Sequence, residues 1–435
     1  MSELKKKLSL YGLTMIAIGS CIGSGIFLTP NVVTQNMPHV GLILGVWLLG
    51  GIISIFGALT FAELGSEFPK SGGVYVYIKE AFGDLPAFLY GWVILLVINT
   101  GALAALSIAM VNFLGLFFDI GDGFQTVLAA ILVVFLTILN IFGIAVSEWL
   151  ANLFTGAKLV AIILIILIAF ATTTQLEMKE LIDLQESTIP TNLFSAFFLS
   201  LIGVFWSFGG WHHTSYLSEE AKNASRNIPL AMIIGTGIVT VAYVLVNYAY
   251  MQALPLSEIA RSERVAGDAL EAYFPGGGKY IAILVIISIT GTVAIYTMSA
   301  PRIYFAMARD GFFFKGLSKV HPRFRTPVNA MILQAVWAVI LIFIWKKFVT
   351  IITFVTFMDI LFMMLGASCI FVFRHRKVDA PIKAWGYPIL PALYVLITGI
   401  FVVNTAISLP SESWAGLIIL IGGIPVYYWF KGRDY

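Results

Sequence analysis

The sequence predicts an all-α membrane protein with twelve transmembrane helices, on the basis of its composition, its hydropathy pattern and the placement of its basic residues. Hydrophobic residues make up 59% of the 435 residues, charged residues make up 11%, and the mean hydropathy is +0.94. A soluble surface needs roughly 25–35% charged residues, so a soluble protein is excluded. The apolar residues form runs of around 20, the length that one helix needs to cross a bilayer.

Twelve such runs are separated by short polar connections. They are expected to span the membrane at residues 8–29, 41–66, 84–113, 124–146, 149–172, 193–217, 229–253, 278–304, 327–346, 349–372, 386–408 and 413–430. The longest hydrophilic stretches, 173–192 and 254–277, are expected to be extracellular connections. No low-complexity tract or linker interrupts the chain, so residues 1–435 are expected to form one domain.

The basic residues predict that both chain ends lie in the cytoplasm. Of the 26 Lys and Arg residues, nineteen lie at the ends or in even-numbered connections, six lie in odd-numbered connections, and Lys158 lies within a span. Lys and Arg beside membrane spans are retained in the cytoplasm, so the bias sets the orientation. The net charge of +3 follows from the same bias and does not indicate a nucleic-acid partner.

Glycines interrupt the first and sixth spans near their midpoints. The first span carries Gly23 and Gly25, and the sixth carries Gly209 and Gly210. Each Gly in a helix interior costs about 1 kcal/mol relative to Ala. A helix unwinds at membrane depth only where its freed backbone groups face protein or a water-filled cavity. Helix N-termini suit a carboxylate and freed carbonyls suit an ammonium, so a zwitterion such as an amino acid fits both.

The alternative interpretation is that these glycines only allow close helix packing. The two breaks lie five spans apart, which is the separation that an inverted repeat of five plus five helices produces. This spacing favours a secondary transporter with a midplane site over packing alone.

Four motifs follow one another along the chain, at residues 22–27, 68–77, 208–223 and 302–311. In this order they resemble the amino acid–polyamine–organocation superfamily, and within it the bacterial members of the L-amino acid transporter group. The resemblance implies discontinuous helices 1 and 6, and alternating access between two states. It also implies repeat one at 8–172, repeat two at 193–372 and two added helices at 386–430.

The resemblance also implies which groups bind the substrate. The amides of Gly23, Ser24 and Gly25 would hold its carboxylate. The carbonyls of Cys21, Trp206 and Gly209 would receive its ammonium.

The size of the side-chain pocket is expected to follow from the residues around it. Ser207, Gly209 and Gly210 lie near one side of the expected site, and Trp206 and Trp211 are expected to close on it. Spans one, three, six and eight carry no Asp or Glu at midplane depth, so a small neutral amino acid such as alanine, serine or threonine is the expected substrate.

Lys158 is expected near the bilayer centre. It lies ten residues beyond Glu148, which is about 15 Å along a helix. An ammonium at that depth costs several kcal/mol unless it is paired. In the resembling group a lysine at this position stands where sodium-coupled relatives bind Na⁺, which implies sodium independence, and Tyr243 is expected beside it.

Three further ionisable residues leave alternatives open. His212, followed by His213, departs from the Asn, Asp or Glu common in the resembling carriers. Gating, proton coupling or a plain hydrogen-bonded role all fit this pair. Asp359 in span ten is open to proton coupling, a gate contact or a neutral, hydrogen-bonded carboxyl.

The sequence therefore predicts a multi-pass plasma-membrane transporter that exchanges neutral L-amino acids without sodium. The alternatives are a proton-coupled symporter and a non-transporting sensor on the same fold. No enzyme motif, metal site or cofactor site is recognised. Cys21 and Cys369 lie within spans, so neither a disulfide nor a disulfide-linked subunit is expected, and membrane lipid and the amino acid are the expected partners.

Overall fold

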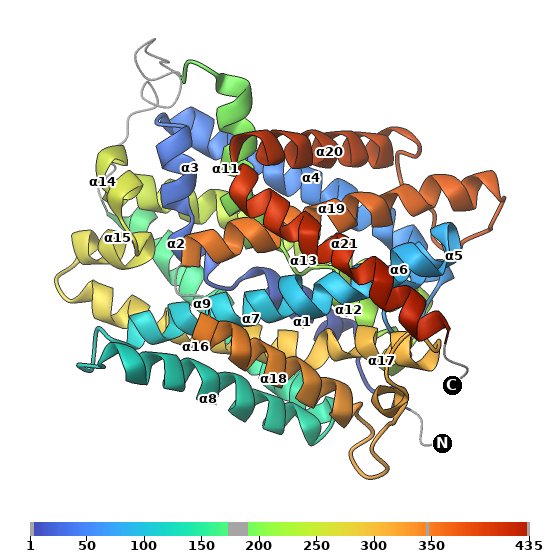
Figure 1. The fold of residues 1–435 in the computed structure, drawn as a ribbon. Coiled ribbons are helices and arrows are strands. Elements are labelled where there is room, and N and C mark those ends of the chain that lie inside the picture. Colours follow the sequence, from blue (N-terminus) through green and yellow to red (C-terminus); the bar gives the residue numbers. More distant parts are fainter. Residues whose placement is uncertain (1–3, 173–189, 345–347, 433–435) are drawn as a thin grey trace.

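The computed structural model describes residues 4–172, 190–344 and 348–432, and within them the chain is helical apart from one isolated bridge between Leu8 and Ala221 (Figure 1). The first half contains α1 (Leu10–Cys21), α2 (Gly25–Leu28), α3 (Pro30–Asn36), α4 (Val40–Glu67), α5 (Val74–Phe82), α6 (Asp84–Val93), α7 (Asn99–Leu114), α8 (Asp122–Ile141) and α9 (Ile144–Ala171).

The second half contains α11 (Leu193–Phe208), α12 (His213–Tyr216), α13 (Ala224–Ala253), α14 (Leu256–Arg261), α15 (Val265–Tyr273), α16 (Gly277–Ser299), α17 (Pro301–Arg309), α18 (Val328–Ile344), α19 (Phe348–His375), α20 (Ile389–Ser408) and α21 (Pro410–Lys431). Short 3₁₀ turns at Ser218–Glu220 and Lys315–Ser318 join some of them.

Ten helical segments of the described chain are long and apolar enough to cross a membrane, and α11 and α18 are shorter apolar helices. Ten of the predicted spans therefore coincide with such segments, and those predicted at 193–217 and 327–346 contain the shorter α11 and α18. The chain is a multi-pass membrane protein. Most of the expected connection at 173–192 lies outside the described residues, and the connection at 254–277 contains the helices α14 and α15.

The helices divide into an inner and an outer set. In the most apolar window of α1–α2, 83% of the residues are buried, and in that of α6–α7 the share is 89%. The corresponding share is 33% for α8 and for α9, and 28% for α20 and for α21. The inner helices therefore form the core, and the outer helices present apolar side chains to lipid.

Candidate functional site

The first helix breaks where the sequence predicted. α1 ends at Cys21 and α2 begins at Gly25, and the side chain of the intervening Ser24 is fully buried. A Cβ atom at Gly25 would lie 2.4 Å from Ser207 Oγ and 2.8 Å from Ser207 Cα. Only glycine permits this approach, so α2 starts directly against α11.

The second break lies opposite the first. α11 ends at Phe208, and α12 resumes at His213. Between them Gly210 has a φ of +110°, and a Cβ atom there would lie 2.7 Å from Ser20 Cβ. Glycine is required both by the left-handed backbone and by the contact with α1.

Tyr243 on α13 ties the two breaks together. Its hydroxyl lies 2.9 Å from the carbonyl oxygen of Cys21 and 2.9 Å from that of Ser207, so one donor is shared between two freed carbonyls. The thiol of Cys21 lies 3.2 Å from the carbonyl oxygen of Phe208. The N–H of Gly23 also donates to the Cys21 carbonyl, at 2.8 Å.

Lys158 lies fully buried against the break in α1. Its Nζ atom donates to the Gly19 carbonyl at 2.7 Å and to Thr292 Oγ1 at 2.7 Å. Thr292 in turn lies 3.0 Å from the Gly19 carbonyl and 3.1 Å from the Ile22 carbonyl. This contact braces α9 and α16 against α1, with the Lys158 amino group at the place where the helix carbonyls are freed.

A cavity of about 30 Å³ lies beside the two breaks. The helices α7, α11, α16 and α19 and the α11–α12 connection surround it, and Gly209 and Gly210 border it. Its polar and aromatic lining includes Trp206, His212, His213, Asn99, Tyr296, Thr356 and Asp359. Oδ1 of Asp359 is buried and has no hydrogen-bond partner among the described residues. His213 stacks on Tyr296 at 4.2 Å between ring centroids, and its Nδ1 lies 2.6 Å from Ser299 Oγ.

Not every residue expected at the site reaches this cavity. Trp211 lies against Phe61 of α4, with ring centroids 5.3 Å apart, and does not line the cavity. Ser207 faces α2, where its hydroxyl lies 3.0 Å from Thr29 Oγ1. The structure therefore places Trp206 at the cavity and Trp211 in the packing behind it.

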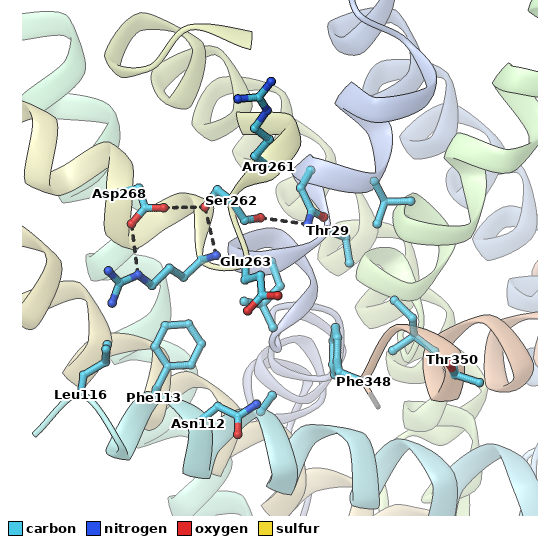
Figure 2. A pocket seen from close by; sticks show the side chains of 16 residues that line it. Thr29, Asn112, Phe113, Leu116, Arg261, Ser262, Glu263, Asp268, Phe348 and Thr350 are labelled. Carbon is cyan, nitrogen blue, oxygen red and sulfur yellow. Dashed lines mark hydrogen bonds and ion pairs between the residues drawn. The ribbon is translucent and has the colours of Figure 1, made fainter. Parts of the chain in front are cut away.

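A much larger hollow, of about 800 Å³, is shown in Figure 2, and the helices α2, α3, α14 and α15 that border it lie on the side opposite the chain ends (Figure 1). Its walls come from α2–α3, α7, the α14–α15 connection and the start of α19. Arg264 and Asp268 form an ion pair at its rim, with 3.1 Å between Nε and Oδ1. Phe348 lines this hollow and lies 6.0 Å from the Trp206 ring, so these two rings separate it from the small cavity.

The side that faces the chain ends is closed by polar pairs. The hydroxyl oxygens of Tyr90 and Tyr216 lie 2.6 Å apart and are fully buried. Farther out, Glu220 and Arg302 form a two-pronged ion pair with both N···O distances at 2.8 Å, and each side chain is at most 1% exposed.

Glu219 forms a second ion pair on the side that faces the chain ends. Its carboxylate pairs with Arg309 at 2.7 Å and accepts the backbone N–H of Ser71 at 3.1 Å. Burial acts to raise the pKa of Glu219, but these two partners outweigh it and hold the pKa below its ordinary value of 4.5. The rings of Trp206 and Phe348 thus lie between the site and the 800 Å³ hollow. The tyrosine pair and the two ion pairs lie between the site and the face of the chain ends.

Sequence reasoning missed several cavity residues. Asn99, Tyr296 and Thr356 are polar residues within apolar spans, and that position is the signal that could have identified them. Asn99 follows a π-helical turn at Ile94–Ile98, a feature that often marks functional sites.

Comparison with known proteins agrees with this architecture. The sequence profile of the amino acid permease family matches residues 8–427. The serine/threonine exchanger SteT of Bacillus subtilis (strain 168) is 33% identical over 437 aligned positions, covering 99% of this chain and 98% of that protein.

Two human proteins show similar likeness. The cystine/glutamate transporter is 32% identical, with 98% of this chain and 86% of that protein covered. The large neutral amino acids transporter small subunit 2 is also 32% identical, with 98% and 80% covered. The likeness therefore extends over nearly the whole chain.

Proposed function

This chain belongs to the amino acid permease family, and we propose that it is a secondary active transporter that exchanges small neutral L-amino acids across the plasma membrane. The observation that carries the proposal is the contact between the two helix breaks, where Gly25 meets Ser207 and Gly210 meets Ser20. The contact brings α2 N–H groups and α11 carbonyls to one place at mid-membrane, which suits a zwitterion. The exchanger activity named for the Bacillus subtilis relative supports the same conclusion.

The substrate carboxylate is proposed to bind the N–H groups of Ser24 and Gly25 at the start of α2. The N–H of Gly23 completes this set once it leaves the Cys21 carbonyl. The ammonium is proposed to bind the carbonyls of Trp206 and Gly209. The Cys21 carbonyl already accepts two hydrogen bonds, which fill its two lone pairs, so its share in binding requires a rearrangement.

The side chain of the substrate is proposed to enter the cavity beside Asp359. A volume of about 30 Å³ admits two or three non-hydrogen atoms, which fits alanine, serine or threonine. The unpartnered Oδ1 of Asp359 would accept a hydrogen bond from a hydroxyl group there. His212, His213 and Asp359 are proposed to act in gating or coupling as this cavity fills and empties.

Lys158 is proposed to make transport independent of sodium. Its ammonium already supplies a positive charge beside the Gly19 carbonyl, where a bound cation would otherwise compensate the freed helix end. A second cation at this place would meet electrostatic repulsion. Tyr243 is proposed to couple the two breaks so that α1 and α11 move together.

We further propose the repeat and the topology that the sequence predicts. Repeat one would cover about 8–172 and repeat two about 193–372, within one domain, with α20 and α21 added after them. Both chain ends would lie in the cytoplasm, which makes the 800 Å³ hollow extracellular. The protein would work without a disulfide-linked subunit, because Cys21 and Cys369 are both buried.

Transport into liposomes tests the proposal. The purified protein is reconstituted without sodium, and uptake of radiolabelled L-serine and L-alanine is measured with unlabelled L-serine, or no amino acid, trapped inside. Exchange predicts uptake that requires trapped amino acid and is unchanged by sodium or by a pH gradient.

Two results would count against exchange. Uptake into empty vesicles that depends on an inward proton gradient would indicate a proton-coupled symporter and would shift attention to Asp359 and the histidine pair. Tight binding of L-serine without any uptake would indicate a sensor on the same fold.

A further inference from the structure

A second hollow, of about 570 Å³, lies on the face that carries the chain ends and is separate from the amino acid site. Three segments form it: the N-terminal segment at 4–7, the turn between α8 and α9 at 142–145, and the loop at 322–325 that precedes α18. The proposed function assigns no role to this hollow.

The hollow is strongly basic. Four cationic side chains line it, namely Lys5, Lys7, Arg323 and Arg325, and all four are exposed. No Asp or Glu lies in its lining, and none of the four cations forms an ion pair within the part of the chain that the structure describes. Four like charges in one concave site create a potential that attracts an anion.

The walls of the hollow are held in place by hydrogen bonds and ring contacts. Thr326 Oγ1 donates to the Ile141 carbonyl at 3.0 Å, which fixes the loop to the end of α8. The rings of Phe142 and Phe324 meet edge to face with centroids 5.4 Å apart. A Cβ atom at Gly143 would lie 3.2 Å from the Phe324 carbonyl oxygen, so the turn and the loop are closely packed.

An apolar stripe continues from the hollow along the outer surface. Phe142 is 52% exposed, and on the first three turns of α9 Val146 is 37%, Trp149 61% and Leu153 51% exposed. These side chains face the surrounding lipid of this multi-pass protein, and a Trp at this depth is typical of the membrane interface. A ligand that fills both features needs an anionic head and apolar chains.

We propose that this hollow binds the phosphodiester headgroup of an anionic phospholipid, whose acyl chains lie along Phe142, Val146 and Trp149. Guanidinium groups such as those of Arg323 and Arg325 form charge-assisted hydrogen bonds to phosphate oxygens. Basic pockets between helices on the cytoplasmic side are suited to such headgroups. The apolar stripe favours a membrane lipid over a soluble phosphate.

Through the N-terminal segment, the hollow is also connected to the residues around the Glu220–Arg302 ion pair. The N–H of Lys7 donates to the Glu220 carbonyl at 2.8 Å, and the N–H of Lys222 donates to the Leu8 carbonyl at 2.9 Å. A phospholipid that holds Lys5 and Lys7 would therefore fix the N-terminal segment beside the Glu220–Arg302 pair.

The test measures lipid retention by the full-length protein. Nanodiscs are made from phosphatidylcholine with a small fraction of phosphatidylglycerol, and the phosphatidylglycerol bound after extraction is counted by native mass spectrometry. Arg323→Gln/Arg325→Gln is expected to lower retention about tenfold or more, because two cations near the surface are lost. The matched control, Lys315→Gln/Lys319→Gln, removes two exposed lysines nearby in the same connection that do not line the hollow, and it should retain the lipid.

A second variant distinguishes loss of lipid binding from misfolding of the loop at 322–325. Lys5→Gln/Lys7→Gln changes only the N-terminal segment and should also lose phosphatidylglycerol. Equal retention by the wild type and both hollow variants, or equal loss in the control, would overturn the proposal. Displacement of the lipid by inorganic phosphate at equal concentration would also overturn it, because the site would then be one for a soluble anion.

Discussion

Side chains from three helices satisfy the carbonyls that the break in α1 sets free. Lys158 donates to Gly19, Tyr243 donates to Cys21, and Thr292 lies within hydrogen-bond distance of the carbonyls of Gly19 and Ile22. An unsatisfied backbone group at membrane depth costs several kcal/mol, so these contacts allow the unwound segment to exist without substrate. The α2 amides and the carbonyls of Trp206 and Gly209 then remain for the proposed substrate.

Asp359 is the residue whose substitution should change selectivity. Asp359→Leu removes the unpartnered oxygen from the cavity at similar size. A hydrogen bond contributes about 0.5–1.5 kcal/mol net, so the KM for L-serine should rise about two- to tenfold relative to that for L-alanine. Exchange assays in liposomes with each amino acid measure the ratio.

Asp359→Asn serves as the control for this change. It keeps an acceptor oxygen in the cavity, so it should preserve most of the preference for serine. If Asp359→Leu raised both KM values equally, Asp359 would have no contact with the substrate side chain.

Glu219 should contribute stability that depends on pH. Because the pKa of folded Glu219 lies below the ordinary value of 4.5, its stabilisation is fully present above that value and is lost as the pH falls through the folded pKa. Glu219→Gln should therefore unfold at a lower temperature than the wild type near neutral pH, and the difference should shrink below pH 4.5. Thermal unfolding in detergent across this range measures it.

The exposed Glu258 provides the comparison, since Glu258→Gln removes a carboxylate that has no ion pair among the described residues. Its unfolding temperature should match the wild type at every pH. A constant offset for Glu219→Gln down to strongly acidic pH would show that the carboxylate charge is not what stabilises the side that faces the chain ends.

The sequence identified the charged residues at mid-span, but it did not identify the residues that they contact. Lys158 and Asp359 stand out because a charge at mid-span is expensive. The contact of Lys158 with Thr292, and the packing of Trp211 on Phe61, depend on how helices far apart in sequence lie together. Single-sequence patterns do not contain that arrangement, so Trp211 was expected at a site where the structure places only Trp206.

Among the helices, the break between α1 and α2 depends most directly on glycine. Gly25→Ala would place its Cβ atom 2.8 Å from the backbone of Ser207, so α2 and α11 would have to separate. Transport should fall at least tenfold, because a misplacement of about 1 Å at the binding groups is enough for such a loss. Exchange activity per reconstituted protein measures it.

Gly237→Ala in α13 is the matched control, since no atom lies within 4 Å of a Cβ atom placed there. It should keep wild-type transport and gain slight helix stability. Normal transport by Gly25→Ala would argue that the two breaks do not need to touch for function.

Helix positions were largely predictable, whereas local irregularities were not. Runs of apolar residues located the spans because lipid requires them, and the glycine pairs located both breaks. The π-helical turn at Ile94–Ile98 has no distinctive residue pattern, since its five side chains are all apolar. The helices α14 and α15 were not anticipated within 254–277, because short interfacial helices lack the length of a span.

For the whole molecule, the two sides of the site differ in how they are closed. The rings of Trp206 and Phe348 lie between the cavity and the 800 Å³ hollow, whereas buried tyrosines and ion pairs close the side of the chain ends. The proposed alternating access requires a second conformation, in which the pairs on the side of the chain ends separate and the 800 Å³ hollow closes. In the proposed orientation, the structure therefore corresponds to the state that is close to opening outward.

Cysteine labelling tests both this state and the proposed orientation. Asn112 lines the outer hollow and is exposed, and the native Cys21 and Cys369 are buried, so a single Asn112→Cys change introduces one accessible thiol. A membrane-impermeant maleimide added to intact cells should label Asn112→Cys and should not label Lys319→Cys, which lies on the face of the chain ends. Labelling of Lys319→Cys alone would place the chain ends outside and reverse the topology.

With the orientation established, addition of L-serine should slow the labelling of Asn112→Cys severalfold, because a transporter that turns over spends part of its time with the outer hollow closed.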